Sequence, residues 1–589
     1  IRRETLKDGE MIKGPALITG RHSTLVLESG WTAIVGNGGI IQASNTEAAD
    51  AKIEKTPKID STQRSIATDL KKNHLDPVLL EVISRRLQGI ADAMGEVLRR
   101  TSISVNVKER RDYSCAIFTA SGKLVANAPH VPVHLGAMGH TVRNLIAEFP
   151  TMYAGDCYLS NDPFAGGSHL PDITAVTPVF CGAQTDGAPD YFVASRAHHA
   201  EIGGISPGSM PPDATSLAEE GVLIRAFPLV RNGEDFRQKL IDLLSAGEYP
   251  SRCPNENIAD ISAQQAAGLF GARSLLDLTK TYSIQQLDLI MSQILNLSGD
   301  TVQRWIQSLP SGQHNFEDKL DDNTPLGVMI EKAEDKLHIQ FQTGPVHPNG
   351  FNATPAIVTA AVLYVFRCLA GSELPLCEGA LRDVNLSIPS GLLNPPHDRD
   401  PHKCVAVVAG NVETSQRVVD VLFGALKSAA GSQGTMNNLL LGNEHFGYYE
   451  TIAGGSGATA NGKGADAVHT HMTNTRITDP EILETRLPVR LLQFAIRHGS
   501  GGGGKNRGGD GVIREFEFLE PLVLSLITSR RTTQPYGIHE GLPGMAGKNL
   551  LYRNGTEHSL GFKTTTRVKA GDRLVIETPG GGGWGRPPS

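Results

Sequence analysis

The sequence is poor in the features that mark membrane, secreted and nucleic-acid-binding proteins. Its 589 residues carry a net charge of −7, so it lacks the basic excess that attracts nucleic acid. No apolar run reaches the roughly 20 residues that a helix needs to cross a bilayer. The first residues are not followed by the apolar core of a signal peptide. We therefore expect a cytoplasmic protein that binds neither nucleic acid nor membrane.

Paired cysteines are also lacking. The seven cysteines are scattered, odd in number and without a C-x-x-C spacing. This pattern argues against both a disulfide framework and a cysteine zinc site, and it fits a reducing compartment. The sequence does not begin with methionine, from which we expect that the natural chain starts elsewhere.

Glycine, in contrast, is abundant, and many of the 64 glycines fall between Gly454 and Gly585. Glycine allows positive φ and a close approach of the backbone to another group. The stretch 499–511 does not match a Walker A motif, because Lys505 is followed by Asn506. Its N–H groups, together with Lys505 and Arg507, could hold an anion such as a cofactor phosphate. The alternative is a set of structural turns.

The pattern of apolar residues predicts an α+β fold, with a large mixed α/β domain whose C-terminal part is rich in β-strands and glycine. Residues 1–44 alternate short apolar runs with turns, as β hairpins do. Residues 45–74 have few large apolar side chains and are predicted to be a linker. The large domain spans 75–585 and opens with a helix capped by Asp76. Further helices are expected at 142–149, 235–246, 258–278, 284–307 and 355–369, and another after Val412.

Two segments concentrate possible metal ligands, 161–172 and 197–204. The ends of two neighbouring strands in a hairpin can bring His169 and Asp172 opposite His198 or His199. Carboxylate and imidazole together suit a divalent ion such as Mn²⁺, Zn²⁺ or Fe²⁺. Adjacent residues of a strand point to opposite faces, so at most one of the two neighbouring histidines should be a ligand. The other would support the site or carry protons. For any one histidine taken alone, a turn-capping role is the alternative.

Other polar groups allow acid–base chemistry. Glu450 with His469 or His471 could transfer protons, which makes these three residues the catalytic candidates. Ser456 does not complete a G-x-S-x-G nucleophile motif, because Ala458 stands in the last position. His130 and His134 alternate as on one face of a strand, and metal, turn and substrate roles remain open for them.

Seven stretches together resemble the hydantoinase B family, which includes the carboxyl-terminal half of 5-oxoprolinase and a subunit of acetone carboxylase. They occur in family order at 109–114, 161–172, 197–204, 410–415, 448–458, 469–474 and 499–511. The ending 578–585 is similar to that of the oxoprolinase branch. Residues 1–44 resemble the last β segment of the hydantoinase A family. Two positions depart from the family pattern, Glu201 in place of Asp and Cys377-Glu378 in place of Asn and a polar residue, which leaves the substrate open.

The resemblance implies that this chain is the B-like half of an ATP-dependent amidohydrolase that opens 5-oxo-L-proline, or a related cyclic amide, to glutamate in glutathione metabolism. ATP would be bound by an A-like domain or subunit, without which the B-like half is expected to be inactive. A homo-oligomer is also expected. A divalent metal (Mn, Zn, Fe or Mg) is placed by the resemblance on the set Asp162, His169, Asp172, His198 and His199. The alternatives are a subunit of an ATP-dependent ketone carboxylase and a non-catalytic scaffold for the A-like half.

Overall fold

The computed structural model describes residues 5–13, 15–19, 24–27, 31–36, 40–45, 76–182, 185–371 and 377–588. The chain divides into two compact units, 1–75 and 76–589. The first unit holds a three-stranded sheet, β1-β4-β5, and the hairpin β2-β3, which lie where the sequence predicts short strands. Their bounds are Met11–Lys13, Ala16–Thr19, Thr24–Leu27, Trp31–Gly36 and Ile40–Asn45 for β1 to β5. The predicted linker falls almost entirely outside the described residues.

The second unit begins with helix α2 (Pro77–Thr101). The Asp76 carboxylate accepts a hydrogen bond from the Val78 N–H, and Pro77 occupies the first turn, where its missing N–H costs nothing. After the short helix α3 (Val105–Lys108), the chain builds a seven-stranded sheet of order β14-β13-β9-β10-β12-β6-β7. In chain order from β6, these strands are Tyr113–Thr119, Leu124–Asn127, Cys157–Ser160, Asp172–Val179, Tyr191–His198, Phe227–Arg231 and Glu234–Asp235. A small pair, β8 (Met152–Tyr153) and β11 (Asp186–Gly187), lies outside this sheet.

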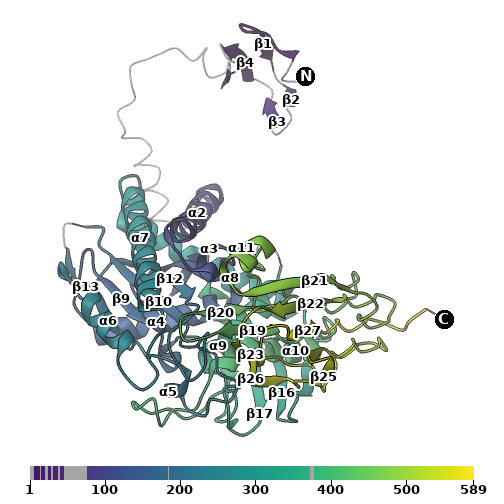
Figure 1. Ribbon diagram of the computed structural model, residues 1–589. Helices are drawn as coiled ribbons and strands as arrows, with labels where there is room; N and C mark the ends of the chain where they lie inside the picture. The colour runs from purple at the N-terminus through teal and green to yellow at the C-terminus, as the bar shows by residue number, and fades with distance from the viewer. Residues whose placement is uncertain are drawn as a thin grey trace, which may run out of the picture. The chain divides into compact units, whose positions relative to one another are not determined.

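Helices α4 (Pro132–Glu148) and α7 (Pro254–Thr279) cover opposite faces of the seven-stranded sheet (Figure 1). Val176 of β10 packs with residues of α4 in one apolar cluster, whereas its neighbour Thr177 lies against Gly268 of α7. Successive residues of a strand point to opposite faces, so the alternation of β10 separates the two layers. The direction in which a side chain of this sheet points therefore decides which helix it meets.

One local prediction is wrong. The segment with His130 and His134 is not a strand, because helix α4 begins at Pro132. Proline suits the first helical turn, and the polar-apolar alternation here is too short to outweigh it. The helix expected at 142–149 is the end of α4. The other predicted helices are present as α6 (Arg237–Ser245), α7, α8 (Ile284–Ser308), α9 (Pro355–Leu369) and α10 (Ser415–Ala425).

The middle of the chain adds a second sheet, β15-β16-β17-β18, packed with α9 and α10 in one large apolar cluster. Its strands are Gly312–Lys319, Pro325–Ala333, Lys336–Thr343 and Val384–Ser387. Short elements connect these parts: η3 (Pro163–Ala165), α5 (Leu217–Glu220), η4 (Glu378–Leu381) and η5 (Gly410–Thr414). The last of these is a π-helical turn that runs directly into α10.

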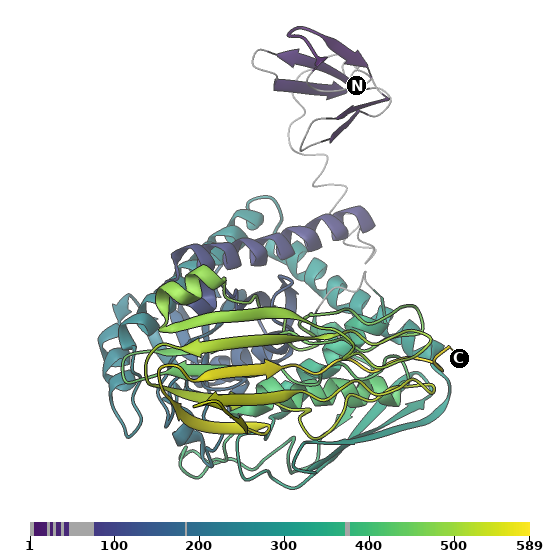
Figure 2. The ribbon, with the colours of Figure 1, turned by 45° about the vertical axis from the view of Figure 1, so that its right-hand side comes forward.

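The C-terminal part is β-rich, as the sequence predicts, and two sheets share one apolar core (Figure 2). The first sheet, β20-β19-β23-β26, consists of Gly447–Glu450, Asn438–Gly442, Leu522–Ile527 and Lys563–Val568. The second, β21-β22-β27-β24-β25, consists of Val489–Arg497, Gly511–Phe518, Arg573–Glu577, Lys548–Arg553 and Thr556–Ser559, and helix α11 (Pro480–Arg486) precedes it. Leu439 and Leu526 of one sheet and Phe516 of the other belong to this core.

The clustered glycines let backbone pack on backbone at one end of this β-rich part. A Cβ on Gly581 would lie 1.9 Å from the Ser456 carbonyl oxygen, and one on Gly509 would lie 1.9 Å from the Ala465 carbonyl oxygen. Backbone hydrogen bonds join these segments, such as the one from the Gly581 N–H to the Gly509 carbonyl oxygen at 2.9 Å. This close approach supports the structural explanation for the glycine run.

The fold class is thus α+β, as predicted from the sequence. Within the described ranges, no helix is both long and apolar enough to cross a membrane.

Candidate metal centre

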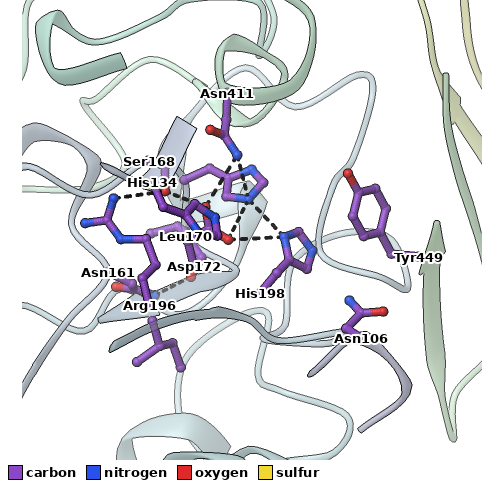
Figure 3. A network of polar contacts seen from close by, with 12 residues as sticks. Asn106, His134, Asn161, Ser168, Leu170, Asp172, Arg196, His198, Asn411 and Tyr449 are labelled. Atoms are coloured by element: carbon purple, nitrogen blue, oxygen red, sulfur yellow. Dashed lines mark hydrogen bonds and ion pairs between the residues drawn. The ribbon is translucent and has the colours of Figure 1, made fainter. Parts of the chain in front are cut away.

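The site is built on the end of the β10–β12 hairpin. Asp172 and His198 are directly paired across the two antiparallel strands. Paired residues share one face of a sheet, and here it is the face covered by α4. His169 stands three residues before Asp172, in the turn that leads into β10, and the Asp172 N–H donates to its carbonyl oxygen. The hairpin and the turn before it therefore bring together three side chains, of which Asp172 and His198 are labelled in Figure 3.

The three side chains converge tightly and are all buried. Asp172 Oδ1 lies 3.3 Å from His169 Nε2 and 3.2 Å from His198 Nδ1, and the two ring nitrogens are 3.2 Å apart. One ligand atom from each of these residues lies within 4.8 Å of the others. Two imidazoles and one carboxylate are a common donor set for a divalent transition-metal ion.

The contacts of Oδ2 orient the Asp172 carboxylate. Oδ2 accepts hydrogen bonds from the Ser168 hydroxyl and from Asn411 Nδ2, and it lies 3.2 Å from His134 Nε2. Oδ1 faces the two imidazoles and has no hydrogen-bond partner among the described residues. Burial favours the protonated acid, but His169 and His134 oppose it and hold the pKa of Asp172 well below its usual range. An ionised oxygen that is buried and unpartnered fits a site for a cation.

The tautomer of His169 follows from its neighbours. Its Nδ1 lies 3.2 Å from the Val408 carbonyl oxygen, which can only accept, so Nδ1 carries the hydrogen. Asn411 Nδ2 donates to Nε2 at 3.1 Å, which agrees with a lone pair on that nitrogen. A metal bound at the centre would take this lone pair in place of the Asn411 N–H. Asn411 lies in η5, and π-helical turns are frequent at functional sites.

His198 is held by an aromatic stack. Its ring lies 4.4 Å from the Tyr449 ring, centroid to centroid, and the Arg110 guanidinium lies over the same tyrosine at 4.8 Å. Burial lowers the pKa of His198, which favours the neutral imidazole that a metal needs. Its Nε2 has no partner among the described residues.

Two of the five predicted ligands do not join this cluster. His199 points to the α7 face, where it contacts Asn257 and Gln264. The Asp162 carboxylate caps the turn at Phe164 and forms an ion pair with Arg225 at 2.6 Å. The neighbouring Glu201 likewise binds backbone N–H groups and Arg252 rather than the centre.

The predicted acid–base residues have the following contacts. Glu450 is buried in a two-bond ion pair with Arg514, at 2.7 and 3.1 Å, and it also accepts from the Tyr448 hydroxyl. His471 lies 3.3 Å from Asp420, and His469 is partly buried, with a pKa lowered by burial to about 4. Glu450 and His471 thus each lie in an ion pair, and their predicted catalytic role stays a prediction.

The two predicted anion-binding residues have contacts within the glycine-rich part. Arg507 pairs with Asp510 and Asp466 inside the glycine-rich part. The Lys505 N–H donates to the Gly585 carbonyl oxygen. His130, which precedes α4, lines an apolar cavity of about 200 Å³ together with Tyr364, Arg367 and Asn474.

Sequence reasoning missed some residues of the centre. His134 was open to several roles, and the structure places it on Asp172 from the first turn of α4. Asn411 and Tyr449 lie in stretches that resemble the family, but nothing in their spacing shows that they meet His169 and His198. Ser168 stands inside the ligand segment without a pattern of its own.

Comparisons of the sequence with known proteins point to one family. A family model described as Hydantoinase B/oxoprolinase matches residues 76–587. The 5-oxoprolinase 1 of Arabidopsis thaliana is 41% identical over 99% of this chain and 46% of its own length. The chain thus spans about half the length of the 5-oxoprolinases it matches.

Two solved structures share the fold. An ATP-dependent caprolactamase from Pseudomonas jessenii aligns with a TM-score of 0.77 at 23% identity, over 87% of this chain and 91% of that one. Nucleotide-free acetone carboxylase aligns with a TM-score of 0.78 at 16% identity, over 87% of this chain and 76% of that one.

Proposed function

The chain belongs to the hydantoinase B/oxoprolinase family, and on this basis we propose that it forms the metal-binding part of an ATP-dependent enzyme that opens a cyclic amide, 5-oxo-L-proline. The observation that supports this most directly is the buried centre of His169, Asp172 and His198, with one carboxylate oxygen unpartnered among the described residues. The proposed product is glutamate, and the proposed setting is glutathione metabolism in the cytoplasm.

Opening of a lactam breaks a C–N bond that amide resonance protects. Water adds to the carbonyl carbon, the C–N bond breaks, and the ring nitrogen leaves with a proton. A divalent cation (Mn, Zn, Fe or Mg) held by His169, Asp172 and His198 would supply Lewis-acid polarisation of an oxygen. We assign ATP use to an A-like domain or subunit of the whole protein, in keeping with the similarity to an ATP-dependent caprolactamase.

The chain's own residues would prepare this centre. Ser168 and His134 hold one oxygen of Asp172 and leave the other free. Val408 and Asn411 fix the His169 ring, and Tyr449 fixes the His198 ring. Burial of all three ligands excludes bulk water, which strengthens electrostatic interactions inside the site.

The proposal is tested on the full-length enzyme that contains this chain, by elemental analysis and by ATP hydrolysis that depends on 5-oxo-L-proline. Asp172→Asn keeps the shape of the side chain but removes its charge, so we expect loss of the metal and of coupled turnover. Asp162→Asn is the matched control, because this carboxylate pairs with Arg225 outside the centre, and it should keep the metal.

Full turnover of the Asp172→Asn enzyme would overturn the role of the metal. ATP hydrolysis that requires bicarbonate and a ketone in place of the lactam would assign the enzyme to ketone carboxylation. Normal activity without any bound metal would mean that the cluster of His169, Asp172 and His198 serves only to support the fold.

A further inference from the structure

A buried carboxyl group outside the centre is linked to it through the backbone. Glu220, the last residue of α5, is completely buried. Its Oε1 accepts hydrogen bonds from the N–H groups of Val407 and Val408, at 2.7 and 2.8 Å. Its Oε2 is buried and lacks a partner among the described residues. The carboxyl group therefore acts on this peptide segment through one oxygen.

The segment that Glu220 holds contacts both ring nitrogens of His169. The Val408 carbonyl oxygen accepts from Nδ1, and Asn411, three residues later, donates to Nε2. On its other side the segment is fixed by Gly350, whose carbonyl oxygen accepts from the N–H groups of Ala409 and Gly410, at 2.7 and 2.9 Å. A small displacement of residues 407–411 would thus change the tautomer or the direction of the His169 ring.

We propose that Glu220 is a positioning residue for the metal centre. By holding the N–H groups of Val407 and Val408, Glu220 fixes the Val408 carbonyl, which keeps the hydrogen of His169 on Nδ1. The Nε2 lone pair of His169 is then directed toward the metal. The inference rests on the metal centre of the proposed function. Groups that orient a metal-bound histidine from behind typically change metal affinity by about 10- to 100-fold when they are removed.

The substitution series separates positioning from simple stabilisation. Glu220→Met has a similar size but no acceptor, so it leaves two buried N–H groups unpaired. Glu220→Gln keeps an acceptor at the position of Oε1, and its amide nitrogen takes the place of the unpartnered Oε2. Glu219→Ala removes the neighbouring carboxylate, which accepts from the N–H groups of Thr215 and Ser216 at the start of α5, and it leaves Glu220 intact.

The experiment titrates the chain with Co²⁺ and with Mn²⁺, measuring affinity by competition with a chelating indicator and ligand geometry by the visible absorption bands of Co²⁺. We expect Glu220→Met to lose about 10- to 100-fold in affinity and to change the Co²⁺ spectrum. Glu220→Gln should stay within about threefold of the unaltered chain. Glu219→Ala should keep affinity and spectrum even if its melting temperature falls.

A second measurement does not depend on metal. In protein labelled with ¹⁵N-histidine, the His169 ring should show hydrogen on Nδ1 in the unaltered chain and in Glu220→Gln, and a mixture of tautomers in Glu220→Met. If Glu220→Met does not fold, Glu220→Asp replaces it, because the shorter side chain cannot reach both N–H groups.

The outcomes of these measurements distinguish the two proposals. Unaltered affinity, spectrum and tautomer in a folded Glu220→Met or Glu220→Asp chain would overturn the positioning role. If the unaltered chain and its His169→Ala variant bind Co²⁺ and Mn²⁺ equally, the metal centre itself fails, and the ¹⁵N measurement still decides whether Glu220 sets the tautomer.

Discussion

His198 and His199 are adjacent in sequence but belong to different environments. His198 faces α4 and the centre, whereas His199 faces α7 and contacts Asn257 and Gln264. The alternation of a strand predicts that only one of the two can be a ligand, and the structure points to the first. The sequence could not choose between them, because the choice depends on which helix covers which face of the sheet.

This difference predicts a split between two variants. His198→Gln should lose metal affinity, because it removes a ligand, while the α7 face stays intact. His199→Gln should keep metal affinity and unfold at a lower temperature, because it disturbs two buried hydrogen bonds, worth about 1 kcal/mol each. Metal titration and thermal denaturation of both variants provide the check. Equal loss of affinity in the two would contradict the assignment.

Glu413 predicts a pH dependence of stability. Burial raises its pKa to about 7 from 4.5, against the hydrogen bonds from Thr435 and Met436, which lower it. A raised pKa means that the folded state binds the proton more tightly than the unfolded state, so this contribution is complete below pH 4.5 and is lost as the pH rises through 7.

The advantage of the unaltered chain over Glu413→Gln should therefore shrink between pH 5 and pH 8, by an amount on the order of 3 kcal/mol. Urea denaturation of both chains at several pH values measures it. Unfolding free energies that change in parallel would show that Glu413 does not titrate in this range.

At the scale of elements, the helices with a long apolar stripe could be predicted, because the repeat recurs over several turns in α2, α7 and α8. Shorter features could not. The alternation around His134 suggested a strand, whereas Pro132 starts a helix, and the π-helical turn η5 has no periodic pattern to reveal it. Both of these elements carry side chains of the centre, so His134 and Asn411 were missed because the elements that hold them were not predicted.

The glycine-rich part gives a prediction at this scale. Gly581→Ala should destabilise the protein by about 1–3 kcal/mol or more, because the new Cβ would meet the Ser456 carbonyl oxygen. Gly462→Ala is the matched control, since a Cβ there has nothing within 4 Å. Chemical denaturation compares the two. If both variants were equally stable, the segments around Gly581 and Ser456 would move apart to accept the new Cβ without a loss of unfolding free energy.

At the scale of the whole molecule, the family was predictable from the sequence, and the match over residues 76–587 confirms the resemblance. The predicted roles of Lys505 and Arg507 and the boundary of an A-like segment stay predictions. The order of the family-like stretches along the chain reveals the family, but it does not show which distant segments are in contact. Arg110 and Tyr449, for example, are in contact although 339 residues separate them.

All residues of the centre lie in the unit 76–589, which contains its own apolar cores. We predict that a chain of residues 76–589 folds and binds the same metal in the same amount as the chain of 589 residues. Circular dichroism and elemental analysis of the shorter chain are the measurements. A folded but metal-free product would show that residues 1–75 contribute to binding.

The pairing of Asp172 with His198 has a consequence for how such a protein can change over evolution. Both ligands are set by the register of one hairpin, so the metal site can persist while the surrounding segments diverge. A slip of this hairpin that brought Ala197 opposite Asp172 would instead remove one imidazole from the site in a single step.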